Sequence, residues 1–327
     1  MVAASGLDRL VGDPRWCVHP VQLMGAAIGA LRQGVEAWAA DRPGKLRLGG
    51  ALLAALVVAA SAAVGWALEQ LLRISGGPGG LGAWLALGLV VVALASALAG
   101  RSLRLAVEAV LEPLALEPPD LPLARQRLAL IVGRDVQGLS RQELWRAAAE
   151  TASENAVDGL FAPLFWMLLG AFVWGLAPQA PGPLAFAWAY KASSTLDSML
   201  GYRTGRLRWL GTAGARLDDL LTWLPCRLTA LSLGQLAQAL ADGASDPSPN
   251  AGVSEAAYAH AVGVQLGGAN YYGGELRQKP LLNTGGGPVT GASVQQMLGL
   301  SERTALIWLA VAKGWALLWT AAQALDQ

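Results

Sequence analysis

The chain has 327 residues, of which 54% are hydrophobic and only 14% are charged, and its formal net charge is +1. Soluble globular proteins carry roughly 25% charged residues, so a surface that faces water on all sides is excluded. A disordered chain is excluded too, and the balanced charge excludes a basic face for nucleic acid. We therefore predict an all-α, polytopic integral membrane bundle with amphipathic helices and loops on its cytoplasmic side, formed by residues 1–327 as a single domain.

Residues 1–49 lack the basic and apolar stretches of a signal peptide, so we expect a cytoplasmic N-terminal segment. Two apolar stretches follow at 50–72 and 81–99, each long enough to cross a hydrocarbon core of about 30 Å. The sequence ISGGPGG at 74–80 is typical of a tight turn. Residues 50–99 should therefore form a transmembrane hairpin.

Basic residues lie at the two outer ends of this hairpin. Arg42, Lys45 and Arg47 precede the first stretch, and Arg101 and Arg104 follow the second. Because the cytoplasmic flanks of membrane spans are enriched in arginine and lysine, we expect both ends of the hairpin on the cytoplasmic side. The membrane is expected to be the inner membrane of the cell.

Four further segments complete the predicted order. Residues 100–159 should form a cytoplasmic helical segment, and 160–190 a second apolar hairpin interrupted by prolines at 178, 181 and 183. Residues 191–303 read as a motif-rich cytoplasmic segment, and 304–324 as a C-terminal span. The stretch 217–241 is apolar but charged in places, so the number of full spans stays open.

Carboxylates recur on one face of the predicted helix at 140–158. Glu150, Glu154 and Asp158 are spaced four residues apart, after a capping box formed by Ser140 and Glu143. Such oxygen-rich stripes suit Mg²⁺ bridged to substrate phosphates. The alternative is a solvated face whose charge is offset by neighbouring arginines.

The segment that leaves the second hairpin carries cations instead. Lys191 and Asp197 are followed by Arg203, Arg206 and Arg208. We expect this set to meet the acidic stripe at one membrane surface and to hold phosphoryl groups there. For Arg206 and Arg208, anchoring to lipid head groups is an equally good interpretation.

Downstream, the glycines and prolines of 246–288 predict an extended cytoplasmic loop. A P-loop is excluded because no G-x-x-x-x-G-K-[ST] sequence occurs. Of the two histidines, His260 fits a packed helix position, whereas His19 is the better candidate for lining a site.

These blocks resemble the CobD/CbiB family of cobalamin biosynthesis, the adenosylcobinamide-phosphate synthases. The resemblance rests on DRLVGDPRWCVHPVQLMG, ETASENAVDGLFAPLFW, YKASSTLDSMLGYR, ARLDDLLTWLPCRLTA and SPNAG, in this order along most of the chain. It implies a multi-pass membrane ligase that uses ATP, with Mg²⁺ as a hypothesis, to join a propionate carboxylate of adenosylcobyric acid to (R)-1-amino-2-propanol or its O-phosphate. The protein would assemble as a homo-oligomer or with other membrane enzymes of cobalamin synthesis. Its other expected partners are the two substrates and membrane lipids.

Site residues are assigned on this basis. The catalytic candidates are Glu154, Asp158, Lys191 and Asp197. The metal candidates are Glu150, Glu154, Asp158 and Asp218. The candidates for substrate or phosphate binding are His19, Ser153, Asn155, Thr195, Tyr202, Arg203, Arg216, Arg227, Asn250, Gln265 and Asn270.

Two other functions stay open. A membrane phosphotransferase acting on an alcohol or lipid is suggested by Asp158 and Gly159 at the entrance of an apolar stretch. A permease or sensor is suggested by Lys313 and Asp219 as charges inside the membrane.

Overall fold

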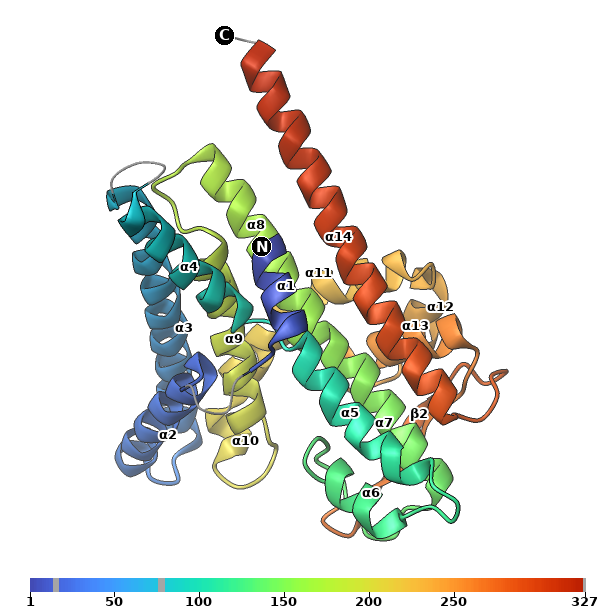
Figure 1. The fold of residues 1–327 in the computed structure, drawn as a ribbon. Helices are drawn as coiled ribbons and strands as arrows, with labels where there is room; N and C mark the ends of the chain where they lie inside the picture. Colours follow the sequence, from blue (N-terminus) through green and yellow to red (C-terminus); the bar gives the residue numbers. More distant parts are fainter. Residues whose placement is uncertain (14–17, 76–79, 326–327) are drawn as a thin grey trace. The chain divides into compact units, whose positions relative to one another are not determined.

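The computed structural model describes residues 1–13, 18–75 and 80–325. Its chain divides into two compact units (Figure 1). Unit 1 comprises Met1–Ala99 and Ala162–Thr222, and unit 2 comprises Gly100–Phe161 and Trp223–Gln327. Each unit is therefore assembled from two separate stretches of the chain.

Unit 1 is helical in its described residues. Its helices are α1 (Val2–Leu10), α2 (Pro20–Ala39), α3 (Pro43–Ile74), α4 (Leu81–Ala95), α8 (Ala162–Leu176), α9 (Pro183–Leu200), α10 (Leu207–Leu210) and the first part of α11 (Thr212–Ser232). Helix α9 packs along both α3 and α8 (Figure 1). Gly65 allows the close approach, because a Cβ there would lie 2.9 Å from the Ala185 backbone.

A buried carboxylate holds the turn of this hairpin. Glu69 on α3 accepts hydrogen bonds from the backbone N–H groups of Gly182, at 2.8 Å, and Leu184, at 2.5 Å. These N–H groups belong to the start of α9, where the helix itself offers them no acceptor. Glu69 is 1% exposed, and its charge is satisfied by the helix terminus that it caps.

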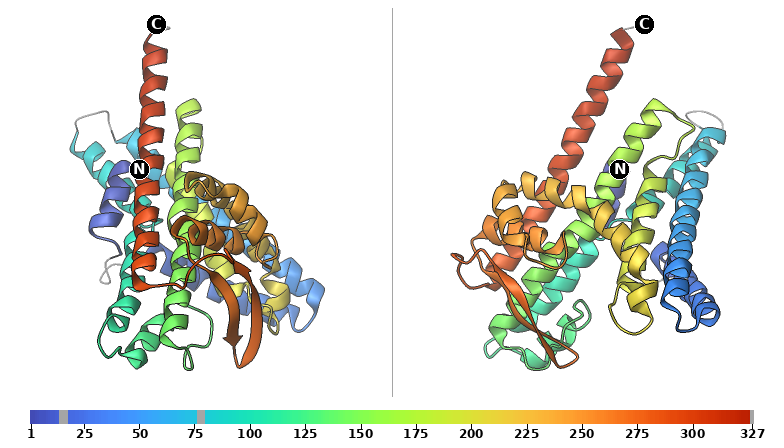
Figure 2. Two further views of the ribbon diagram at one scale, coloured as in Figure 1. Left: turned by 90° about the vertical axis from the view of Figure 1, so that its right-hand side faces the viewer. Right: turned by 180° about the vertical axis from the view of Figure 1, so that it is seen from behind.

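Unit 2 combines helices with a small sheet. Its elements are α5 (Gly100–Leu114), α6 (Leu121–Leu128), α7 (Arg141–Ala156), the π-helical turn η1 (Val157–Phe161), the rest of α11, α12 (Leu236–Gly243), α13 (Ala251–Val262), β1 (Leu266–Tyr272), β2 (Glu275–Leu282) and α14 (Gly291–Leu325). Helix α7 packs against α5 and α14, and α12 packs against α13. Figure 2 shows the two strands side by side as arrows.

The β-hairpin corrects two predictions. Strands β1 and β2 are antiparallel, with Tyr272 opposite Glu275 across a two-residue turn in which Gly273 and Gly274 have φ of 59° and 81°. Paired glycines with positive φ are typical of tight hairpin turns. The protein is mostly helical but not all-α, and 246–288 contains α13 and this hairpin, not an extended loop. The glycines at 267 and 268 interrupt the alternation that would have indicated a strand.

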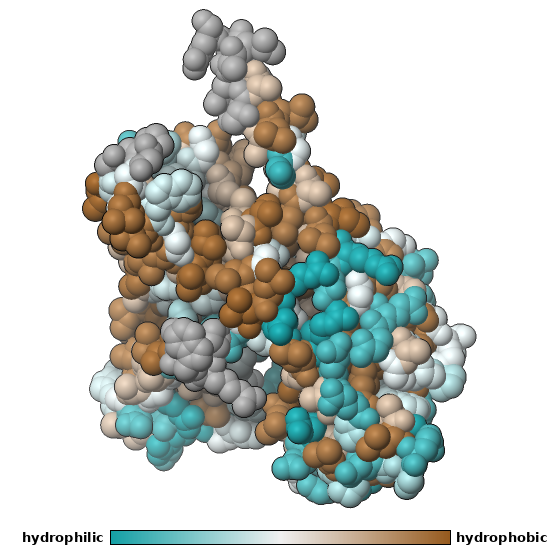
Figure 3. Space-filling view, in the orientation of Figure 1, coloured by the Kyte–Doolittle hydropathy of each residue, from teal (hydrophilic) through white to brown (hydrophobic). Residues whose placement is uncertain are grey.

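Among the described residues, three stretches are long and apolar enough to cross a membrane: Pro43–Ile74, Leu81–Leu114 and Arg141–Leu176. The first includes the predicted span 50–72, and the second includes 81–99. Of the turn predicted at 74–80, residues 76–79 lie outside the described residues. Apolar side chains gather on the face that α4 presents in Figure 3, as expected for a surface in contact with lipid. The orientation and the span at 304–324 stay predictions.

Candidate functional site

A buried carboxylate of α7 organises one end of unit 2. Glu150 is 0% exposed, and its Oε2 lies 2.5 Å from Nη1 of Arg134. Its Oε1 lies 3.3 Å from Nη1 of Arg146 and accepts a hydrogen bond of 3.0 Å from the Gly267 N–H. A buried carboxylate is tolerated only when it is paired and hydrogen-bonded, and here two guanidinium groups and one amide meet that requirement.

The same arginines connect α7 to strand β1. Arg134 donates to Oδ1 of Asn270 at 2.8 Å, and Arg146 donates to the carbonyl oxygens of Gly267 and of Ala269. Burial opposes the charged guanidinium of Arg134, but the Glu150 carboxylate outweighs it and raises the Arg134 pKa. Glu150 and its arginines thus fix the hairpin on the helix.

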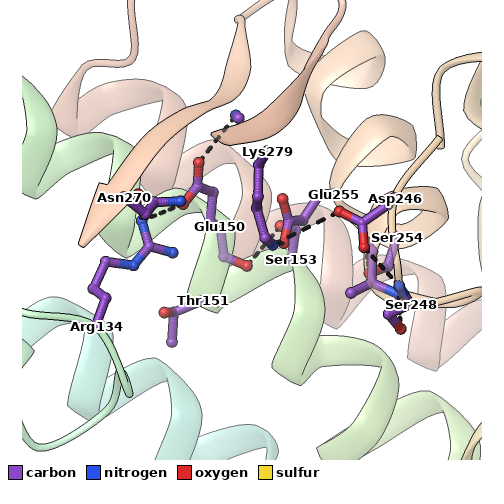
Figure 4. Close-up of polar contacts among 12 residues, drawn as sticks. Arg134, Glu150, Thr151, Ser153, Asp246, Ser248, Ser254, Glu255, Asn270 and Lys279 are labelled. Carbon is purple, nitrogen blue, oxygen red and sulfur yellow. Dashed lines mark hydrogen bonds and ion pairs between the residues drawn. The ribbon is translucent and has the colours of Figure 1, made fainter. Parts of the chain in front are cut away.

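A second ion pair lies beside the first. Lys279 on β2 places its Nζ 2.8 Å from Oε1 of Glu255 on α13 and 4.0 Å from Oδ2 of Asp246 (Figure 4). Glu255 is 0% exposed, and the Asp246 side chain is almost fully buried. A helix, a loop and a strand therefore each contribute one ionisable group. We call these three residues, Lys279, Glu255 and Asp246, the Lys279 cluster.

The loop before α13 positions Asp246. Its Oδ1 accepts a hydrogen bond of 2.8 Å from the Ser248 N–H, and Ser248 Oγ accepts one of 3.1 Å from the Ala251 N–H. These short-range contacts are typical of turns that initiate a helix. A Cβ at Gly252 would collide with Asp246, so only glycine allows the loop to pack this closely.

The charges of the Lys279 cluster influence one another. Burial raises the pKa of the Glu255 carboxyl to about 8, and Glu150 and Glu154 add to the effect although Lys279 opposes it. Burial disfavours the Lys279 ammonium, but the carboxylates of Glu255 and Glu154 outweigh it and raise the lysine pKa. Lys279 therefore stays charged, whereas Glu255 can exchange a proton near neutral pH.

Several polar atoms of this region have room for another partner. Within the described residues, Oε2 of Glu255, Oδ2 of Asp246 and Nδ2 of Asn270 are buried and have no hydrogen-bond partner. Unsatisfied buried polar atoms are costly and rare in folded proteins. Two of these atoms belong to the Lys279 cluster and the third to the neighbouring Glu150 group, and we take this region as the candidate site.

The carboxylates of the acidic stripe predicted along 150–158 lie on α7 and on the turn that follows it. Glu154 lies one helical turn after Glu150 on α7, and the charges of Lys279 and Arg134 stabilise its carboxylate. Asp158 lies in the π-helical turn η1 that follows α7. Burial raises the pKa of the Cys226 thiol, and the negative charge of Asp158 adds to it, so Asp158 acts toward α11.

A second polar group lies in unit 1. Burial raises the pKa of Asp218 on α11 to about 7, the charges of Asp197 and Asp219 raise it further, and Lys191 opposes them. Burial also raises the pKa of Asp219, against the attraction of Arg203. Four predicted site residues of unit 1 therefore belong to this group: Lys191, Asp197, Arg203 and Asp218. That this group meets the acidic stripe stays a prediction.

Many of the predicted binding residues have local structural contacts. His19 caps α2, since its Nδ1 accepts a hydrogen bond from the Val21 N–H at 3.2 Å. Arg227 donates to Asn250 Oδ1 at 2.7 Å and so holds the loop before α13. Four more donate to backbone carbonyl oxygens of their own helix or a nearby loop: Ser153, Asn155, Thr195 and Gln265. Tyr202, Arg203 and Arg216 are exposed, and Asn270 contacts both arginines of Glu150.

The metal assignment stays a prediction. The described ranges contain no group of three or more His, Cys, Asp or Glu side chains placed to hold a metal ion. Of the predicted ligands, Glu150 is bound on both oxygens by the arginines and the Gly267 N–H. Asp218 belongs to unit 1, and Glu150, Glu154 and Asp158 belong to unit 2.

Sequence reasoning missed five residues of the site: Arg134, Arg146, Asp246, Glu255 and Lys279. Asp246 and Glu255 flank the SPNAG motif, and Lys279 follows the tyrosine pair by a few residues. A charged residue inside an otherwise apolar helix, such as Glu255 in AGVSEAAYAHAV, was the available signal.

The fold and the site define a mainly helical protein with membrane-length apolar helices and a buried cluster of carboxyl groups around a lysine. The chain belongs to the CobD/CbiB protein family, whose model matches residues 1–301. It is 44% identical over 310 residues to the cobalamin biosynthesis protein CobD of Synechocystis sp., covering 92% of this chain and 86% of that one. It is 37% identical over 318 residues to the cobalamin biosynthesis protein CbiB of Salmonella typhi, covering 93% and 91%. The comparison with solved structures finds no match.

Proposed function

We propose that this chain catalyses an amide-forming step of cobalamin biosynthesis, joining a propionate carboxylate of adenosylcobyric acid to (R)-1-amino-2-propanol or its O-phosphate. Family membership supports the pathway. One observation supports the chemistry: Lys279 pairs with one oxygen of the buried Glu255 carboxyl and leaves the other without a partner in the described chain.

The charge of the site suits an amine. Four carboxyl groups, those of Glu150, Glu154, Asp246 and Glu255, surround three cations, those of Arg134, Arg146 and Lys279. Once Glu255 has lost its proton and all four carboxyl groups are ionised, one negative charge is in excess, and a substrate ammonium group would neutralise it.

The amine must lose a proton before it attacks a carbonyl carbon. A group with a pKa of about 8, as in Glu255, is well matched to accept that proton near neutral pH. Asp246 would orient the amine, and Glu154 stays a second candidate for the proton acceptor. Lys279 would keep Glu255 in place throughout the proton transfer.

A carboxylate is a poor electrophile, so the reaction requires activation, for which ATP would supply the phosphoryl group. Mg²⁺ would bind together with the nucleotide. Asp158, Lys191 and Asp197 are further proposed catalytic residues. We also propose that the protein is a multi-pass protein of the inner membrane with its site on the cytoplasmic side. Assembly as a homo-oligomer or with other membrane enzymes of the pathway belongs to the same proposal.

The test is direct assay of the purified full chain in detergent. Adenosylcobyric acid is incubated with each amine, with and without ATP, and the product is identified by its mass. We expect an amide product only with ATP, and a loss of at least about 100-fold in rate for Glu255→Gln, as for a lost general base. Glu275→Gln, which changes an exposed carboxylate of β2, is the matched control. A Glu255→Gln rate equal to wild type would remove Glu255 from the mechanism, and absence of any amide would contradict the function.

A further inference from the structure

Cations and indole rings gather where α3 begins in unit 1. Lys45 lies with its Nζ 4.9 Å from the centre of the Trp38 ring. Arg47 on α3 and Arg208 on α10 both lie over Trp209, with their Cζ atoms 4.4 Å and 5.0 Å from its ring centre. One indole therefore carries two guanidinium groups.

These two guanidinium groups differ from the neighbouring Arg206. Arg206 donates to Oδ1 of Asp41 at 2.7 Å, so its charge is balanced. Neither Arg47 nor Arg208 has a carboxylate within 4.0 Å in the part of the chain that the structure describes. Both are therefore cations without a carboxylate partner among the described residues, and an anion bound beside Trp209 would balance their charge.

The fold enforces this arrangement. A Cβ at Gly50 would collide with the carbonyl oxygen of Leu210, so α10 lies directly against the first turns of α3. A Cβ at Gly49 would collide with Val35 of α2 in the same way. The adjacent glycines let two helices approach α3 from different sides, and Trp209 and Arg208 are brought to Arg47 as a result.

The surface beside the cations is suited to acyl chains. Leu48, Leu52 and Leu56 are more than half exposed and lie four residues apart, so they form one stripe that starts immediately after Arg47. Helix α3 is one of the three stretches long enough to span a bilayer. Guanidinium and indole groups at the end of such a stripe lie at the depth of lipid head groups.

We propose that Arg47, Arg208 and Trp209 form a binding site for the phosphate of an anionic phospholipid in the leaflet at the N-terminal end of α3. The guanidinium groups donate to the phosphate oxygens, the indole holds both guanidinium groups in position, and the leucine stripe receives one acyl chain. Planar guanidinium groups are well suited to phosphate because they donate two parallel hydrogen bonds.

The experiment measures lipid binding to the purified full chain in uncharged detergent by native mass spectrometry. Phosphatidylglycerol, phosphatidylcholine and inorganic phosphate are titrated separately. We expect wild type to bind phosphatidylglycerol. In the double variant Arg47→Gln with Arg208→Gln, the affinity should fall about 30-fold, which is about fivefold for each guanidinium group removed. Arg73→Gln, at the other end of α3, should bind it like wild type.

The other variants separate charge from folding. Arg47→Lys with Arg208→Lys keeps both charges and should retain most of the affinity. If the double glutamine variant does not fold, the single Arg208→Gln, which changes an exposed side chain, carries the test with a fivefold loss. Equal binding of phosphatidylcholine, unchanged affinity in the glutamine variants, or displacement of the lipid by millimolar inorganic phosphate would each overturn a lipid site.

Discussion

Nζ of Lys279 lies 2.8 Å from Oε1 of Glu255, while Oε2 of the same carboxyl group is buried without a hydrogen-bond partner in the described chain. The lysine thus fixes the carboxyl group through one oxygen and leaves the other available. An arrangement in which both oxygens were paired would stabilise the fold but would offer nothing to a substrate.

The raised pKa of Glu255 predicts a pH dependence of stability. Its carboxyl has a pKa of about 8 in the folded chain instead of 4.5, so the folded state binds the proton more tightly. Between these two values the unfolded chain ionises first, and the free energy of unfolding should fall as the pH rises. Below pH 4.5 this contribution is fully present, and above about pH 8 it is lost. The measurement is the thermal unfolding midpoint of wild type and of Glu255→Gln as a function of pH across this window. If the two midpoints changed in parallel with pH, Glu255 would not be protonated in the folded chain.

The same group predicts a pH dependence of activity. If Glu255 accepts the amine proton, the rate should rise with pH and level off above an apparent pKa near 8. The measurement is kcat/KM for the amine from pH 6 to 9 in the assay described above. A profile unchanged in Glu255→Asp, which keeps a carboxyl group but moves it, would point to another base.

Glu150→Gln should destabilise unit 2. The substitution removes a buried charge and leaves Arg134 and Arg146 without their carboxylate, a change that costs about 3–5 kcal/mol in other buried ion pairs. Thermal unfolding in detergent, with helix content followed by circular dichroism, should show a clearly lower midpoint. Glu275→Gln on the exposed strand is the control and should change little. Equal midpoints would mean that the arginines contribute no net stability through Glu150.

Gly50→Ala should displace α10 from α3. The added methyl group would collide with the Leu210 carbonyl oxygen, whereas Gly44→Ala on the same helix meets no atom within 4 Å. Overpacking of this kind costs about 1–3 kcal/mol, so Gly50→Ala should unfold at lower temperature and Gly44→Ala should not. The pair shares one chemical change and differs only in the space around it, and identical unfolding midpoints would contradict the close approach.

Glu69→Ala should loosen the start of α9. It removes the acceptor for two backbone N–H groups, those of Gly182 and Leu184, which are then left unsatisfied at about 1–3 kcal/mol each. Glu69→Gln keeps one oxygen acceptor and should be less harmful. Proteolysis of the connection between α8 and α9 reports the difference, and equal cleavage of wild type and Glu69→Ala would show that the cap is dispensable.

The sequence by itself determined the features that depend on neighbouring residues. Runs of apolar residues gave the long helices α3 and α4, the proline cluster near Pro181 gave the turn between α8 and α9, and Ser140 with Glu143 gave the start of α7 through the capping box. The sequence also indicated the family, because blocks such as TASENAVDG and SPNAG follow one another in order along most of the chain.

The tertiary structure alone decided the site. Lys279, Glu255 and Arg134 come from a strand, a helix and a turn far apart in the chain, and no local spacing indicates that they meet. It also decided that a π-helical turn containing Asp158 follows α7, because such a turn depends on packing and is not visible in a residue pattern. Local preferences act over a few residues, whereas the pairing of buried charges is a property of the packed chain.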